Sequence, residues 1–273
     1  MKLGVCNEMF ENVPWEKVCE IIAAYGFDGV EIAPFTFATY VTEIGAEKRR
    51  EIRRTAERAG LEVIGLHWLL AKTEGMHVTH PDPAVRARTA EYLVSLVQFC
   101  ADVGGRVLVF GSPKQRDLLE GVDFEQGIEF AAAVFERALA EAERAGVVIA
   151  FEPLSPAETN FGNNTADGAR LVERVGHPNF RLHLDAKAMA SDKRPMDELV
   201  RSYYGLLEHV HVNDVNLLGP GMGELDLRPL VDALTSLGYD KFASIEVFRT
   251  DPGPEAILRE SKAYLDRLLA RHT

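Results

Sequence analysis

The sequence predicts an α/β fold, a single (β/α)8 TIM barrel that occupies residues 1–273. Two observations lead to this prediction. Eight short β-rich runs alternate with longer segments of helical periodicity, and no linker, compositional break or low-complexity stretch divides the chain. This alternation is typical of βα units built around a parallel sheet. The length of 273 residues also suits such a barrel, which commonly needs about 250.

The expected strands are rich in β-branched and aromatic residues, as strands usually are. They lie at residues 3–7, 29–33, 62–67, 106–111, 147–152, 180–185, 209–214 and 242–248. Between them, residues 83–102 carry apolar side chains at helical spacing. Asp123 is expected to cap the start of the next long helix. Glycines are expected to end several helices, at Gly60, Gly146, Gly176 and Gly238, and a last helix over 254–270 would complete the ring.

Composition and charge exclude several classes of protein. Apolar residues make up 47% of the chain and charged residues 26%, which is ordinary for a globular domain. The 30 basic and 42 acidic residues give a net charge of −12, which argues against a nucleic-acid partner. No apolar run is long enough to span a membrane, and the N-terminal residues do not resemble a secretory leader. We therefore expect a cytoplasmic protein with reduced thiols at Cys6, Cys19 and Cys100.

Side chains alternate along the later strands between an apolar face and a polar face. Leu182 and Leu184 share one face of the sixth run, opposite His183 and Asp185. The interior of such a barrel is normally filled by apolar side chains, so inward polar residues need a reason. They gather near the C-terminal ends of the strands, where barrel enzymes place their active sites. We interpret His183 and His209, which lie deeper on this face, as core histidines.

Four inward polar residues stand near the ends of the last four strands: Glu152, Asp185, His211 and Glu246. Because these strands are neighbours in a barrel, we expect the four side chains to converge. Three carboxylates that lie close together do not all stay ionised without a compensating cation, and burying them unpaired is costly. A divalent metal ion meets both demands. Three oxygen ligands and one nitrogen ligand favour Mn²⁺, with Mg²⁺, Co²⁺ or Zn²⁺ as alternatives.

Other polar residues near strand ends are candidate substrate contacts. His67 ends the third run and is positioned to bond a substrate hydroxyl, with a packing role as the alternative. Lys114, in GSPKQR after the fourth run, would neutralise an enediolate or a phosphate unless it is an ordinary solvated lysine. Together with Arg116 it leaves room for a phosphate site. Lys187 closely follows the sixth run, and Asn213 lies on the inward face of the seventh.

Several motifs follow one another along nearly the whole chain: FEP at 151–153, HLDAKAM at 183–189, HVHVNDVN at 209–216, PGMGELD at 220–226 and SIEVF at 244–248. In order and spacing they resemble the xylose isomerase-like barrel superfamily. Within it, the chain is similar to the sugar phosphate isomerase/epimerase group, which includes the ketose 3-epimerases and hydroxypyruvate isomerase. Each motif alone is weak, and the resemblance rests on the set.

The resemblance implies a metal-dependent isomerase or epimerase that acts on a small carbohydrate or a sugar derivative. In the ketose 3-epimerases, the residues that match the four converging side chains bind one Mn²⁺-like ion. Those that match Glu152 and Glu246 also form an acid/base pair, which moves a proton next to a carbonyl through a metal-bound enediolate. Glu158 matches a glutamate that contacts substrate. Members of the family often dimerise, so the resemblance also implies a homodimer or a larger homo-oligomer.

Two departures from the family pattern keep another function open. Ala188 and Leu217 stand where the ketose 3-epimerases carry a histidine and an arginine that contact substrate. We therefore expect the metal centre to be kept and the substrate pocket to be changed, which makes a free ketohexose doubtful. The alternative is a lyase on the same scaffold, such as a keto-inositol dehydratase or a 3-keto-glycoside eliminase. An abasic-site endonuclease is disfavoured, because Ala188 replaces a zinc-binding histidine and the net charge opposes DNA.

Overall fold

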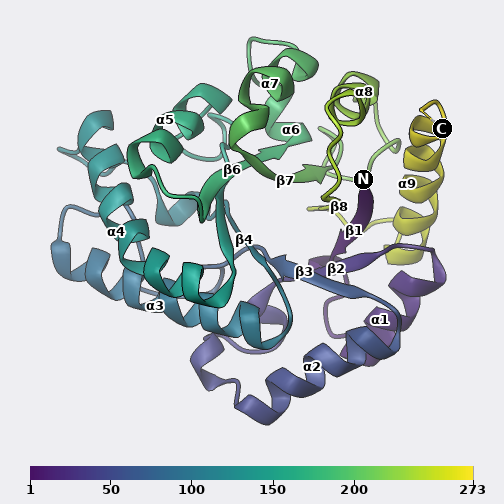
Figure 1. Ribbon diagram of the computed structural model, residues 1–273, viewed down its shortest axis with the longest axis horizontal. Coiled ribbons are helices and arrows are strands. Elements are labelled where there is room, and N and C mark those ends of the chain that lie inside the picture. The colour runs from purple at the N-terminus through teal and green to yellow at the C-terminus, as the bar shows by residue number, and fades with distance from the viewer. Residues whose placement is uncertain (273) are drawn as a thin grey trace.

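The computed structural model describes residues 1–272, and in them eight parallel strands close into a barrel in sequence order. Figure 1 shows the helices surrounding these strands. The predicted (β/α)8 fold is therefore confirmed. The strands are β1 (Lys2–Cys6), β2 (Gly29–Ile32), β3 (Glu62–Leu66), β4 (Val107–Phe110), β5 (Val148–Phe151), β6 (Phe180–Asp185), β7 (Leu207–Val212) and β8 (Phe242–Ile245).

The helices begin and end close to the positions that the sequence predicts. The helix expected over 83–102 has these bounds, and Asp123 caps the next one by accepting a hydrogen bond from the backbone N–H of Gln126 at 2.9 Å. Two helices, α6 and α7, follow β6 before the chain returns to the barrel. The helices are α1 (Trp15–Ala24), α2 (Ala46–Arg58), α3 (Pro83–Asp102), α4 (Phe124–Ala145), α5 (Thr165–Val175), α6 (Ala186–Met189), α7 (Met196–Tyr203), α8 (Arg228–Ser236) and α9 (Pro254–Leu269).

Most of the observed strands are shorter at their C-terminal ends than the sequence predicts. Glu152 and Glu246, expected within strands, come directly after β5 and β8. Their backbone N–H groups still bond to the preceding strands, to Phe110 O at 3.1 Å and Val212 O at 3.3 Å. In a staggered barrel, a residue at a strand end has a partner on one side only. Both glutamates are thus held by the sheet although they stand outside its regular part.

Hydrophobic side chains pack on both sides of the barrel wall. The large outer core lies between strands and helices, and in it Phe151 of β5 contacts Phe135 of α4 with ring centroids 6.3 Å apart. A small separate cluster of Val107, Val109 and Ala150 lies on the opposite, inner side. Burying the outer faces of the strands against helices leaves the inner faces free for polar groups at the C-terminal end.

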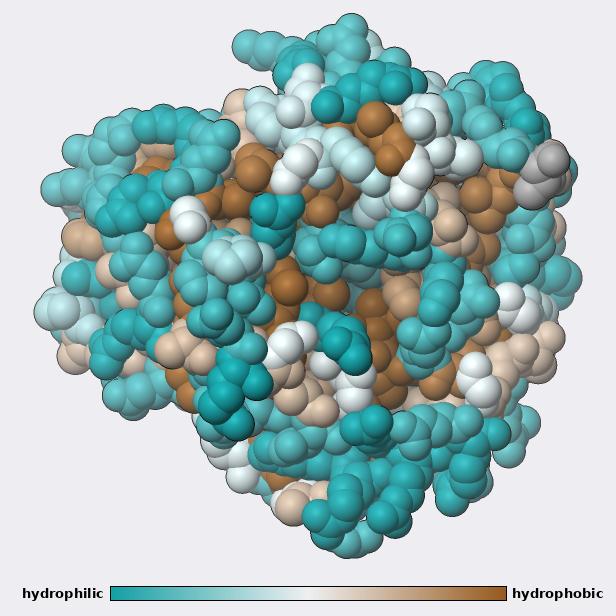
Figure 2. All heavy atoms as spheres, in the orientation of Figure 1, coloured by the Kyte–Doolittle hydropathy of each residue, from teal (hydrophilic) through white to brown (hydrophobic). Residues whose placement is uncertain are grey.

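The barrel closes where β1 pairs with β8, with Lys2 opposite Phe242 and Val5 opposite Ile245. Figure 1 shows both chain ends near this seam. In the face drawn in Figure 2, hydrophobic residues reach the surface mainly near the centre, and hydrophilic residues cover most of the margin. Among residues 1–272, no helix has the length and apolar character needed to cross a membrane.

Candidate active site

Four buried side chains meet at the C-terminal ends of β5 to β8. One ligand atom from each of Glu152, Asp185, His211 and Glu246 lies within 4.8 Å of the corresponding atoms of the other three. The Nδ1 atom of His211 is 3.3 Å from Oε2 of Glu246. Within residues 1–272, neither of these two atoms has a hydrogen-bond partner. The convergence expected from strand order is therefore present in the fold.

The charges in this cluster are poorly compensated by the protein alone. Burial raises the pKa of Glu152 well above its usual range, and the carboxylates of Glu246 and Asp185 raise it further. Burial and Glu246 raise the pKa of Asp185 to about 6. Burial also opposes ionisation of Glu246, but His211 outweighs this effect and the net pKa of Glu246 is lowered. Three carboxylates and one imidazole form a donor set that suits a divalent cation. Two of their atoms, His211 Nδ1 and Glu246 Oε2, have no hydrogen-bond partner among residues 1–272.

Neighbouring side chains hold two of the carboxylates in place. Asp185 accepts hydrogen bonds from the backbone N–H of Ala188 at 2.8 Å and from Nδ2 of Asn213 at 2.6 Å. Glu246 accepts one from Nε1 of Trp68 at 2.8 Å. The two bonds to Asp185 use its two oxygens, one each, whereas Glu246 accepts only through Oε1, and its Oε2 has no partner among residues 1–272. These contacts restrict the rotation of both carboxylates. Such support commonly tunes a metal centre.

A buried glutamate on β2 lies behind the imidazole of His211. Glu31 accepts hydrogen bonds from His209 and, at 3.1 Å, from Nε2 of His211. Burial opposes its ionisation, but these two histidines hold its pKa well below the usual range. An ionised Glu31 holds a ring proton of His211 on Nε2 and directs Nδ1 toward the other three members of the cluster.

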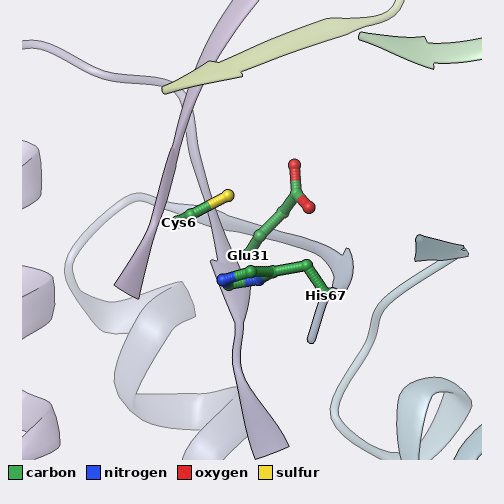
Figure 3. Close-up of side chains that lie close together, drawn as sticks. All are labelled: Cys6, Glu31 and His67. Atoms are coloured by element: carbon green, nitrogen blue, oxygen red, sulfur yellow. The ribbon is translucent and has the colours of Figure 1, made fainter. Parts of the chain in front are cut away.

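The same glutamate also lies close to Cys6 and His67, as drawn in Figure 3. Ligand atoms of these three residues fall within 4.8 Å of one another. In the view of Figure 3, however, the carboxylate of Glu31 and the ring of His67 point in different directions. The Nε2 atom of His67 contacts Oε2 of Glu8 instead, at 2.8 Å. We therefore assign Glu31 to the support of His211.

A cavity of about 440 Å³ opens beside the cluster. An aromatic wall borders it, in which the ring of Trp68 stacks on Phe248 with centroids 5.9 Å apart. The backbone of Trp68 has φ +50°, a left-handed conformation that is uncommon for a bulky residue. The residues that line the cavity include His67, Trp68, Lys72, Ser112, Lys114, Glu152, Leu154, Glu158, Glu246 and Phe248. Two carboxylates of the cluster thus face a space large enough for a small ligand.

Comparison with known families identifies this architecture. The profile of a family described as the xylose isomerase-like TIM barrel matches residues 19–268. The chain belongs to the xylose isomerase-like TIM barrel family. This confirms the resemblance carried by the motifs of the later strands.

Several curated proteins that are similar to this chain are named as sugar epimerases. An L-ribulose 3-epimerase of Mesorhizobium japonicum is 31% identical over 178 residues, which are 64% of this chain and 59% of that protein. A D-psicose 3-epimerase of Ruminiclostridium cellulolyticum is 25% identical over 91% of this chain and 84% of its own length. A 3-dehydro-D-guloside 4-epimerase of Escherichia coli is 24% identical over 97% of this chain and 99% of its own length.

Solved structures share the fold at lower sequence identity. A D-psicose 3-epimerase from Clostridium cellulolyticum, crystallised with D-tagatose, has a TM-score of 0.85 at 21% identity and covers 100% of this chain and 99% of its own. A protein called IOLI, described with a bound zinc atom, has a TM-score of 0.78 at 19% identity and covers 100% of this chain and 99% of its own. At these identities the likeness shows the fold.

The other candidate residues of this xylose isomerase-like barrel fall into two groups. His67, Lys114 and Glu158 line the cavity that contains Glu152 and Glu246. Lys187 lies at the rim, where its Nζ donates to Oε1 of Glu158 at 2.6 Å. Asn213 is fully buried, bonds Asp185 through its amide nitrogen and accepts the backbone N–H of Lys187 at 2.9 Å. The geometry gives Asn213 a task in orienting Asp185.

Arg116 does not join Lys114 in a phosphate site, for which the sequence leaves room. Its guanidinium has 0% exposure and donates to the backbone carbonyls of Gly111, Glu152, Phe161 and Gly162. It also lies 4.4 Å from the centroid of the Phe151 ring. Its donors are therefore used inside the protein, where they tie the end of β4 to the segments after β5.

Three further residues support the site, and of these sequence reasoning missed Glu8. Glu8 contacts His67 and accepts the backbone N–H of Val247 at 3.0 Å, although nothing in the N-terminal sequence signals this role. The residue type of Trp68 suits a sugar-facing or a core position, and its bond to Glu246 adds a further role. For Glu31, in the second expected strand, a substrate contact and a supporting role are both open from the sequence, and its bonds to His209 and His211 favour the supporting role.

Proposed function

We propose that the chain is a divalent-metal-dependent sugar epimerase. The observation that carries this proposal is the buried cluster of Glu152, Asp185, His211 and Glu246, whose ligand atoms lie within 4.8 Å of one another. Membership of the family and the names of the curated relatives support it. The cytoplasmic location and the homo-oligomeric state expected from the sequence stay predictions.

The four clustered residues would hold the ion. When bound, a divalent ion there compensates the carboxylate charge and stabilises negative charge that develops on a substrate carbonyl oxygen. The oxygen-rich donor set favours Mn²⁺. The zinc described in IOLI keeps Zn²⁺ as an alternative for this chain. Trp68, Asn213 and Glu31 would keep the ligands oriented, through the hydrogen bonds described above.

Glu152 and Glu246 would act as the acid/base pair. Their surroundings shift the two pKa values in opposite directions, raising that of Glu152 and lowering that of Glu246. Both groups line the same cavity. Epimerisation requires removal of a proton next to a carbonyl and return of a proton to the opposite face.

The cavity residues would position the sugar. His67, Lys114 and Glu158 face the space beside the two glutamates, with chemistry that suits hydroxyl and carbonyl oxygens. Lys187 would act through its ion pair with Glu158 or by direct contact at the rim. We place Asn213 behind Asp185 rather than against the substrate, because its side chain is fully buried.

Solvent-exchange NMR tests the proposal. The protein is dialysed against EDTA, reconstituted with Mn²⁺ and incubated in D₂O with D-psicose, L-ribulose and a 3-dehydro-glycoside, the sugar types in the names of the relatives. At least one substrate should gain deuterium next to its carbonyl, and the epimer should appear. Glu152→Gln and Glu246→Gln should each lower the rate by roughly 100-fold or more, whereas Asp185→Ala should lose the metal.

Glu62→Gln serves as the matched control, because Glu62 is exposed at the start of β3 and pairs with Lys2. It should behave as the wild type. Full activity in EDTA, or in either Gln variant, would contradict the metal and acid/base assignments. Release of water or of an aglycone, without an epimer, would instead identify the lyase that the changes at Ala188 and Leu217 keep open.

A further inference from the structure

Exposed hydrophobic side chains gather at the rim of the candidate active site. In residues 1–272, the large hydrophobic residues with the highest exposure are Leu119 (37%), Val215 (51%), Leu217 (37%) and Phe248 (37%). The last three border one hollow of about 600 Å³. We call Val215, Leu217 and Phe248 the apolar shelf. Exposed apolar residues that cluster in this way commonly mark a binding surface.

The apolar shelf is continuous with the cavity beside the metal ligands. Phe248 and Glu158 line both the hollow and the cavity. The hollow is built by segments that follow β5, β6, β7 and β8, the strands that carry the four clustered residues. Phe248 stacks on Trp68, which in turn donates to Glu246. A ligand that reaches the glutamates can therefore extend onto the shelf without crossing the protein.

Charged groups beside the apolar shelf are already paired. Lys187 Nζ is 2.6 Å from Oε1 of Glu158 and 4.5 Å from the centroid of the Phe248 ring. Arg249 is paired with Asp251 at 2.6 Å. Both cations have a carboxylate partner, so the surroundings of the shelf do not select for an anionic group. They suit an uncharged, apolar one.

Leu217 is held at this surface by its backbone. It has φ +72°, in the left-handed region that branched side chains rarely adopt. Its carbonyl oxygen accepts the N–H groups of Phe248 and Arg249, each at 3.0 Å. These bonds join the loops that follow β7 and β8. The fold thus fixes an apolar side chain at the rim, in a conformation that costs less for glycine or asparagine.

We propose that the sugar bound by this site carries an apolar substituent, as in an alkyl or aryl glycoside of a keto sugar, and that the apolar shelf binds this substituent. The inference rests on the proposed function, because it places the sugar ring against Glu152 and Glu246. Removing an apolar group from water onto an apolar surface favours binding in proportion to the area buried.

Two probes that differ only in their substituent test the inference. They are the methyl and phenyl β-glycosides of 3-dehydro-D-glucose, titrated by calorimetry into the full-length, Mn²⁺-loaded protein. The phenyl glycoside should bind about tenfold more tightly or better. Leu217→Asn, which suits the left-handed backbone, should reduce this ratio to near one. Leu119→Asn changes a leucine of equal exposure outside the shelf and should keep the ratio.

Equal affinity for the two glycosides in the wild type, or an unchanged ratio in Leu217→Asn, would overturn the inference. Sedimentation velocity on the same samples tests the other occupant, a second copy of the chain. A wild-type dimer that Leu217→Asn dissociates, together with equal affinity of the wild type for the two glycosides, would assign the shelf to self-association. This result would also overturn the inference.

Deuterium exchange separates this inference from the proposed function. A much higher affinity for the phenyl than for the methyl glycoside, without deuterium exchange in either, would support the binding role of the apolar shelf and contradict the epimerase. Exchange in free ketoses together with a ratio near one would keep the epimerase and contradict the shelf.

Discussion

At the scale of single residues, the site depends on groups that stand behind the candidate metal ligands. Glu31 comes from β2, which does not pair with β7 in the barrel, yet it bonds both His209 and His211 of β7. A carboxylate behind a metal-binding histidine fixes the position of the ring proton and increases the basicity of the coordinating nitrogen. In the proposed metal centre, Glu31 would therefore act on the metal through His211.

Glu31→Gln should weaken Mn²⁺ binding by about 10- to 100-fold, because a neutral amide is a poorer acceptor for two histidines. Calorimetric titration of the metal-free protein measures this change. Glu31 is among the groups that raise the pKa of His211, so nitrogen NMR of the His211 ring, recorded without metal, should show the ring losing its proton at lower pH in the variant than in the wild type. Unchanged affinity and an unchanged ring titration in a folded variant would contradict this role.

Asp185 makes the stability of the metal-free protein depend on pH. Its pKa is raised from 3.8 to about 6, so between these values the folded state keeps a proton that the unfolded state releases. The stability contributed by this group therefore falls as pH rises through this window. In EDTA, the advantage of Asp185→Asn over the wild type should grow by roughly 1–3 kcal/mol between pH 4 and 7. Urea denaturation at both pH values measures it, and a constant difference would contradict the shift.

At the scale of elements, the ends of β4 and β5 set the position of Glu152. Gly111 follows β4, and a Cβ atom there would lie 2.4 Å from Oε2 of Glu152. Arg116 ties the carbonyl of Gly111 to that of Glu152. The glycine leaves room for the carboxylate, and the buried guanidinium holds the two strand ends together.

Gly111→Ala and Gly65→Ala should separate damage to the site from damage to the fold. In Gly111→Ala the new methyl meets a flexible side chain, so the protein should stay folded while Mn²⁺ affinity and turnover fall. In Gly65→Ala the methyl would lie 1.9 Å from the backbone oxygen of Val107. The free energy of unfolding of the barrel should therefore fall by about 2 kcal/mol or more. Urea denaturation and metal titration of both variants measure this, and identical profiles would contradict it.

At the scale of the whole molecule, the candidate metal ligands connect four consecutive strands. Asp185 and His211 lie in β6 and β7, Glu152 and Glu246 directly follow β5 and β8, and β8 closes the barrel by pairing with β1. An ion bound by all four residues interacts with a geometry that exists only in the folded barrel. Metal binding should therefore stabilise the entire fold and not one loop.

Excess Mn²⁺ should raise the free energy of unfolding by about 2.7 kcal/mol at 100 times the dissociation constant. Thermal unfolding with and without EDTA measures this as a shift in Tm. Asp185→Ala should lose most of the shift, and Glu62→Gln should keep it. A Tm that does not respond to any divalent ion in the wild type would contradict the metal centre.

Much of the fold could be predicted because it depends on local periodicity. The alternation of Leu182 and Leu184 with His183 and Asp185 sets the inward face of β6, and the bounds of α3 follow from its apolar spacing and its cap at Asp82. The C-terminal ends of several strands were less predictable. At those ends hydrogen bonding depends on the neighbouring strand, which the local sequence does not specify.

The site could be predicted in part for the same reason. Strand order and alternation were enough to bring Glu152 and Glu246 to one place. The supporting contacts were not accessible in this way, because Glu8, Glu31 and Trp68 reach the cluster from strands or loops distant in sequence. Arg116 follows Lys114 in the motif GSPKQR, and only the fold shows that its side chain is buried.

The sequence by itself determined the barrel, the inward direction of the four clustered residues and the excess of acidic charge among them, since strand periodicity and composition are local properties. Only the tertiary structure decided which hydrogen-bond donors hold each candidate ligand. It also decided that Arg116 donates all its bonds to backbone carbonyls and that the apolar shelf adjoins the cavity. These features depend on the closure of β8 onto β1 and on the packing of distant loops, which place atoms within bonding distance irrespective of their separation along the chain.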